Sequence, residues 1–131
     1  MRISDKEGIG ICSVVENNIA LKSLDLSNND LGEKSSVALG NSLMANMSLT
    51  ELNLSWNKLR AKGIIHIAEG LSPNLGLQYL GIAWCGMQDA GAEAFGAMLK
   101  SNRVSQVGLS QSSWVPRIAT ALNMASLITT S

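Results

Sequence analysis

Residues 49–59 read Leu49-Thr50-Glu51-Leu52-Asn53-Leu54-Ser55-Trp56-Asn57-Lys58-Leu59 and fit the pattern L-x-x-L-x-L-x-x-N-x-L. The same spacing recurs at residues 21–31 and at residues 77–87, and a weaker copy follows at residues 104–114. The four copies begin at Leu21, Leu49, Leu77 and Val104. Four copies in phase over most of the chain predict an array of stacked repeats.

Each copy predicts a short strand followed by a structural amide. Leu52 and Leu54 are two positions apart, so both point to one side of the strand and leave Asn53 on the other. Asn57 follows the strand, where backbone groups lose their ladder partners. Because an amide both donates and accepts, we expect Asn57 to bond the loop backbone of its own and the adjacent repeat. Cys85 occupies that position in the next copy, with weaker bonds.

Between the strands, apolar and small residues recur at i, i+3, i+4 and i+7, which is typical of one helix face. In the middle repeat these are Ile64, Ile67, Ala68 and Leu71. The large residues are expected to fill the core, and the small one lets the helix approach the strands closely. Each predicted helix meets an asparagine, for which we expect the left-handed conformation that ends many helices. These asparagines are Asn46, Asn74 and Asn102.

The repeats divide the chain into three segments within one structural unit. Residues 1–20 predict a partial N-terminal repeat, with a helix but no strand. Residues 21–103 predict three leucine-rich copies, and residues 104–131 a degenerate fourth copy with a frayed tail. Ser112 stands at the asparagine position of that copy, and Trp114 at a core position. Because neither end resembles a polar cap, we expect missing flanking repeats or end-to-end self-association.

Composition and charge bear on partners and location. The formal net charge is zero, which argues against a broad electrostatic surface for nucleic acid or membranes. No apolar run approaches the roughly 20 residues of a spanning helix, and residues 1–7 lack the apolar core of a signal peptide. Cys12 and Cys85 lie far apart in the repeat scheme, so we expect reduced thiols rather than a disulfide. A cytoplasmic location fits these features.

The 28-residue period with full helices resembles the ribonuclease-inhibitor-like class of leucine-rich repeats. Residues 49–74 follow its consensus, with Gly63 at the family glycine and Ile67 and Leu71 at the helix leucines. Within that class, residues 52–60 are similar to intracellular multi-repeat proteins of animals, such as the leucine-rich-repeat-containing proteins of the 74 type. The resemblance implies an α/β solenoid, a horseshoe segment with parallel strands on the concave face and helices on the convex face.

The resemblance also implies a non-catalytic module that binds a partner protein on its concave face. Two alternatives remain open. One is a regulator of a small GTPase, similar to the activators of Ran, that works through edge loops containing Lys58 and Arg60. The other is a structural segment of a longer repeat array. The family shares an architecture rather than one activity, so the fold alone selects no partner.

Strand alternation places a set of polar and aromatic side chains on the concave face, where Gly81 and Ala83 are also expected to be exposed. Adjacent strands lie about 4.8 Å apart, so Trp56 and Trp84 should be neighbours. Exposed tryptophans are typical of binding hot spots; alternatively, these rings fold over the strand ends and shield the asparagine ladder. The expected partner-binding residues are Lys22, Asp25, Glu51, Asn53, Trp56, Tyr79 and Trp84.

Catalysis is not expected. His66 is the only histidine, it lies on a predicted helix, and no companions stand at metal-ligand spacing. No glycine-rich phosphate loop is present, so we expect no cofactor, no metal and no enzymatic activity. Asn46 and Asn53 satisfy the glycosylation sequon, but Asn53 lies in the middle of a predicted strand, where a glycan is not expected.

Overall fold

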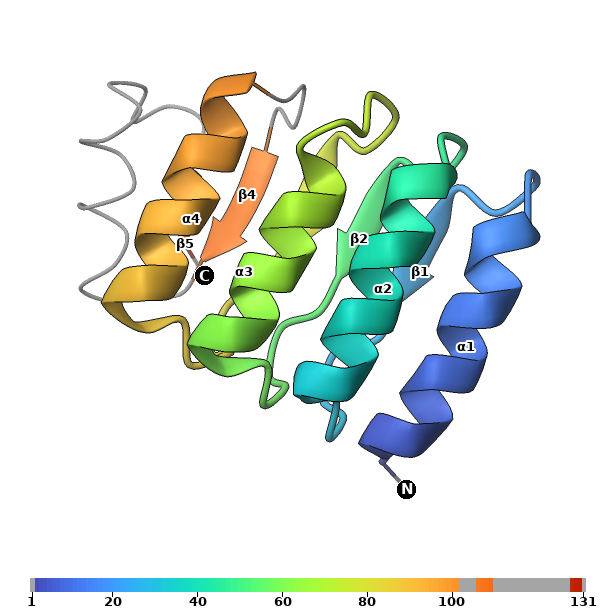
Figure 1. Ribbon diagram of the computed structural model, residues 1–131, viewed down its shortest axis with the longest axis horizontal. Coiled ribbons are helices and arrows are strands. Elements are labelled where there is room, and N and C mark those ends of the chain that lie inside the picture. The colour runs from blue at the N-terminus through green and yellow to red at the C-terminus, as the bar shows by residue number, and fades with distance from the viewer. Residues whose placement is uncertain (1, 102–105, 110–127, 131) are drawn as a thin grey trace.

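Up to residue 109 helices and strands alternate along the chain, and the described elements form two layers, with the helices on one side and the strands on the other (Figure 1). The computed structural model describes residues 2–101, 106–109 and 128–130. The helices are α1 (Asp5–Asn17), α2 (Glu33–Ala45), α3 (Arg60–Leu71) and α4 (Gln88–Ser101). The strands are β1 (Ser23–Asp25), β2 (Glu51–Asn53), β3 (Tyr79–Gly81), β4 (Gln106–Leu109) and β5 (Ile128–Thr130). The expected α/β solenoid is confirmed, with strands on the concave face and helices on the convex face.

The five described strands form one parallel sheet in chain order. Leu52 of β2 pairs with Leu24 on one side and with Leu80 on the other, which is the expected offset of one repeat. Between β3 and β4 the offset is shorter by one position, because Leu80 pairs with Val107. The predicted period is therefore confirmed. Val104, Asn102, Ser112 and Trp114 lie outside the described residues, and the division of the chain into three segments stays a prediction.

The core lies between the two layers and is built from the repeated leucines. Leu52, Leu54, Leu77 and Leu80 are fully buried on the strand side. The helix positions named from the sequence, which are Ile64, Ile67, Ala68 and Leu71, are buried against them. No helix in the described part of the chain has the length and apolar character needed to cross a membrane.

Close contact between neighbouring helices depends on glycine. A Cβ atom at Gly40 would lie 2.6 Å from the carbonyl oxygen of His66, and one at Gly70 would collide with the backbone of Gly40. Neither contact can be relieved by turning a flexible side chain, because in both cases the added Cβ would contact backbone atoms. A Cβ atom at Gly10, on α1, would have no other atom within 4 Å.

We expect Gly70→Ala to lower the free energy of unfolding by about 2 kcal/mol, since the new methyl group must push α2 and α3 apart. Gly10→Ala provides the matched control, because it meets nothing and reduces the backbone freedom of the unfolded chain; it should stabilise by about 0.5 kcal/mol. Urea unfolding followed by circular dichroism measures both. Equal effects of the two substitutions would contradict the close helix packing.

The side chains at the predicted ladder position, which lie in the turns after β2 and β3, bond loop backbone of their own and neighbouring repeats. Asn57 donates to the carbonyl oxygens of Leu26 and Leu54, both at 2.9 Å, and accepts from the Leu31 N–H at 3.0 Å. Cys85 replaces the amide in the next repeat, where its thiol donates to the Leu54 carbonyl at 3.0 Å. The expected ladder between neighbouring repeats is confirmed for these residues.

A second ladder lies at the start of the strands, and it corrects the expectation for Asn46 and Asn74. Neither residue is left-handed; Asn46 has φ −90° and ψ 121°. Its amide donates to the carbonyls of Val15 and Asn18, at 2.7 and 2.9 Å, and accepts from the Leu49 N–H at 2.9 Å. Asn74 bonds the repeat before it in the same way. The asparagine is used for its side-chain bonds, which join neighbouring repeats, rather than for its tolerance of positive φ.

Candidate interaction surface on the concave face

A hollow of about 400 Å³ lies on the concave face. It is lined by Ser27, Asn28, Asn53, Ser55, Trp56, Tyr79, Ala83 and Trp84. Four of the residues named from the sequence, Asn53, Trp56, Tyr79 and Trp84, are therefore brought together. The other three, Lys22, Asp25 and Glu51, are exposed on or next to β1 and β2 but do not line the hollow.

Trp56 and Trp84 are stacked, with ring centroids 5.2 Å apart and an angle of 26° between the planes. The predicted adjacency of the two indoles is confirmed, and each residue remains 54% exposed. Their position differs from the expectation, because both lie in the turn after the strand. Their φ values, 60° and 57°, place them in the left-handed region, as does the φ of 59° at the equivalent Asn28.

The left-handed backbone makes tryptophan an unfavourable choice for this turn. The left-handed conformation costs a residue with a Cβ atom about 1–2 kcal/mol of conformational free energy, and among residues other than glycine asparagine is one of those that tolerate it best. The backbone bonds of the turn do not depend on the side chain. Asn28 N–H donates to the Ser55 carbonyl at 2.9 Å, and Trp56 N–H donates to the Ala83 carbonyl at 2.8 Å. The turn therefore needs no indole.

Side chains from β2 and the turn after it form the floor of the hollow. The Asn53 side-chain oxygen accepts from the Ser55 N–H at 3.1 Å, and the Ser55 hydroxyl accepts from the Ala83 N–H at 3.1 Å. A Cβ at Gly81 would lie 2.6 Å from that Asn53 oxygen. Gly81 and Ala83 are buried, contrary to the expectation, because the longer polar side chains of the preceding repeat lie against them.

A carboxylate stands beside the hollow. Asp25 accepts from the backbone N–H of Ser27 at 2.9 Å and from its hydroxyl at 2.6 Å. These bonds hold the pKa of Asp25 below its ordinary value, and the bond from the Ser27 hydroxyl has the largest effect. The carboxyl group is therefore ionised at neutral pH. Glu51 accepts from the Ser23 hydroxyl at 3.3 Å, across neighbouring strands.

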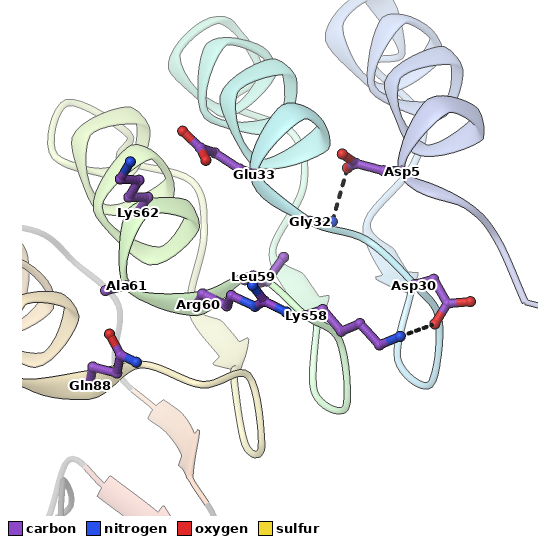
Figure 2. Close-up of a pocket in the computed structure, with 10 residues that line it drawn as sticks. All are labelled: Asp5, Asp30, Gly32, Glu33, Lys58, Leu59, Arg60, Ala61, Lys62 and Gln88. Atoms are coloured by element: carbon purple, nitrogen blue, oxygen red, sulfur yellow. Dashed lines mark hydrogen bonds and ion pairs between the residues drawn. The ribbon is translucent and has the colours of Figure 1, made fainter.

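A second concavity, of about 560 Å³, lies at the edge where the helices begin (Figure 2). It is lined by Asp5, Asp30, Gly32, Glu33, Lys58, Leu59, Arg60, Ala61, Lys62 and Gln88. Three of its charged side chains are already engaged in Figure 2, where Lys58 lies 3.5 Å from Asp30 and Asp5 accepts from the Gly32 N–H at 2.9 Å. Lys58 and Arg60, named for the GTPase alternative, both line this concavity, but its three acidic and three basic side chains balance in charge.

The cysteines are free and buried, as expected for core thiols. Burial raises the pKa of both Cys12 and Cys85 to about 11, so both are neutral at physiological pH and poor nucleophiles. His66 is half-buried on α3. In residues 2–101, 106–109 and 128–130, no group of three or more histidine, cysteine or acidic residues could hold a metal ion.

We expect the two thiols to make stability fall at alkaline pH. Each has a folded pKa of about 11 against an ordinary value of 9.0, so the native state keeps protons that the unfolded state releases. Their contribution is complete below pH 9.0 and is lost as the pH rises towards 11. Urea unfolding across this range measures it. The Cys12→Ala/Cys85→Ala variant should show a shallower fall; identical slopes would refute the assignment.

Replacing either tryptophan by asparagine should change the free energy of unfolding by less than about 1 kcal/mol. The lost ring contact, worth about 1 kcal/mol, is offset by relief of the left-handed strain. Leu80→Ala, at a fully buried position, serves as the destabilising control and should cost about 3 kcal/mol. A loss of more than about 2 kcal/mol in Trp56→Asn or Trp84→Asn would show that the rings hold the fold. Thermal and urea unfolding provide the measurement.

Comparisons with known families agree with this architecture. A leucine-rich repeat family model matches residues 45–68 and 74–96, and a second leucine-rich repeat model matches residues 20–42. The chain is a leucine-rich repeat protein. A comparison with curated protein sequences finds no significant match.

Among solved structures, the chain is similar to one described as leiomodin-1 actin-binding site 2. The two share 23% sequence identity, and the match covers 95% of this chain and 75% of that chain with a TM-score of 0.81. At this identity the likeness shows the fold and does not transfer a partner.

Proposed function

We propose that this protein is a non-catalytic interaction module whose concave-face hollow binds a partner protein. Leucine-rich repeat domains generally bind proteins, so the fold supports the class of function. The observation that carries the proposal is the stacked, half-exposed pair Trp56 and Trp84. Each ring occupies a left-handed turn that asparagine would fill at lower conformational cost. Strain of this kind at an exposed site is consistent with a functional role for the side chain.

The surface has the physical properties of a binding hot spot. Tryptophan and tyrosine are enriched where truncation costs upwards of about 2 kcal/mol of binding free energy, and Trp56, Tyr79 and Trp84 line one hollow. The turns are held by backbone hydrogen bonds to the next repeat, so little ordering entropy is lost when a partner binds. We assign the centre of the contact to these three rings with Asn53, and the charged rim to Lys22, Asp25 and Glu51.

Further features support the finer classification. The regular register of one strand per repeat and the full helices α2 and α3 fit the ribonuclease-inhibitor-like class, and the free, buried cysteines fit a reducing cytoplasmic setting. The GTPase-regulator alternative depends on the edge concavity, where Lys58 is engaged by Asp30. We favour the concave hollow because its tryptophan side chains are half-exposed and the backbone bonds of the turns do not need them.

The test is affinity capture from a cytosolic extract with wild-type protein and with the Trp56→Asn/Trp84→Asn variant. We expect the double variant to lose the captured partner by at least tenfold, as removal of two hot-spot residues would require, while its circular dichroism spectrum stays unchanged. Lys62→Ala, in the edge concavity, is the matched surface control and should capture normally. Undiminished capture by the double variant, or loss with Lys62→Ala alone, would refute the proposal.

A further inference from the structure

The tryptophan column is interrupted at its first position. Asn28, Trp56 and Trp84 occupy equivalent turns of three successive repeats, with the same left-handed φ. Trp84 stacks on one face of Trp56. On the other side the column continues with the short side chain of Asn28, which lines the hollow together with Ser27. The hollow is therefore bounded at this end of the column by a short side chain rather than by a third ring.

Aromatic rings line this space, and an ionised carboxylate, that of Asp25, stands beside it. The face of an indole attracts cations, and tryptophan does so more strongly than tyrosine or phenylalanine. Asp25 lies next to two lining residues: it bonds Ser27, and it pairs in register with Asn53 on the neighbouring strand. Lys22 precedes β1, whereas Ser27 follows it, and Lys22 does not line the hollow.

We propose that the hollow binds an arginine side chain of the partner protein, with its guanidinium stacked on Trp56 and hydrogen-bonded to Asp25. This inference rests on the proposed function and specifies the partner chemistry. Arginine is the side chain that is both planar enough to continue the stack and charged enough to pair with the carboxylate. Lysine offers a compact charge without a flat surface. An aromatic side chain would desolvate Asp25 without bonding it.

The experiment uses two acetylated, amidated pentapeptides of glycine that carry either arginine or its neutral isostere citrulline at the centre. Indole N–H chemical shifts of the full chain report binding during titration. We expect the arginine peptide to shift the Trp56 resonance and to bind about fivefold more tightly than the citrulline peptide, because only the guanidinium carries the charge. Equal binding of the two peptides, or no binding of the arginine peptide, would overturn the inference.

Variants locate the effect. Asp25→Asn keeps an oxygen that can accept from Ser27 and should weaken arginine binding about fivefold. Glu33→Gln removes the same charge from the exposed first turn of α2 and should leave binding unchanged. Asn28→Trp should fill the hollow and abolish binding. The fold should tolerate it, because the equivalent turn of the next repeat already holds Trp56. Unchanged binding in Asp25→Asn or in Asn28→Trp would overturn the inference.

The two levels of the proposal fail separately. If the arginine peptide does not bind while the Trp56→Asn/Trp84→Asn variant still loses its captured partner, the arginine assignment is wrong and the concave-face function stands. If that double variant captures normally, the function itself is wrong. A peptide with phenylalanine in place of arginine tests the other flat side chain, and tighter binding of it would overturn the arginine assignment.

Discussion

The backbone groups at both ends of very short strands must find hydrogen-bond partners, and buried amides supply them. The strands β1, β2 and β3 are each only three residues long, so much of the loop backbone lies beyond the strand ladder. Asn46 and Asn74 bond it where strands begin, and Asn57 bonds it after β1 and after β2. Because each of these amides also bonds the preceding repeat, an unmatched register would leave buried polar groups without partners, at about 1–3 kcal/mol each. This requirement fixes the offset between neighbouring strands at one repeat.

The fixed offset in turn creates the candidate binding surface. Equivalent positions of neighbouring repeats are forced side by side, so any side chain repeated at one position becomes part of a column. At the turn after the strand, the column runs Asn28, Trp56, Trp84, and the two indoles stack. Asparagine stands at position 28, where the next two repeats have tryptophan, and the hollow there is bounded by aromatic and polar side chains. The same rule that holds the repeats together thus places the residues proposed to contact a partner.

The sequence predicted the repeat, its period and the neighbours that follow from that period. Leucine spacing indicated the strands, the buried faces and the pairing of Leu52 with Leu24 and Leu80. It also placed Trp56 beside Trp84. The errors concern features that depend on contact with the neighbouring repeat. Gly81 and Ala83 are buried by side chains of the preceding repeat, and Asn46 bonds the repeat before it instead of turning left-handed.

One signal for the turn geometry was present in the sequence. Asn28 stands at the position equivalent to both tryptophans, and asparagine is, apart from glycine, among the residues most tolerant of positive φ. Strict strand alternation concealed it, since it counts Trp56 as one more strand residue. Ser27 and Asn28 contribute to the hollow from the turn after β1, and Ser55 from the equivalent turn after β2. The pairing of Lys58 with Asp30 depends on side-chain reach between loops, which repeat spacing alone does not specify.

The register can be tested most directly by measuring nuclear Overhauser effects between the indole rings. With centroids 5.2 Å apart, protons of Trp56 and Trp84 should give strong cross-peaks, and these should disappear in Trp84→Asn while the leucine core cross-peaks persist. Absence of any contact between the two rings in the folded wild-type protein would contradict the stacking of equivalent segments from successive repeats, and with it the surface built on that stacking.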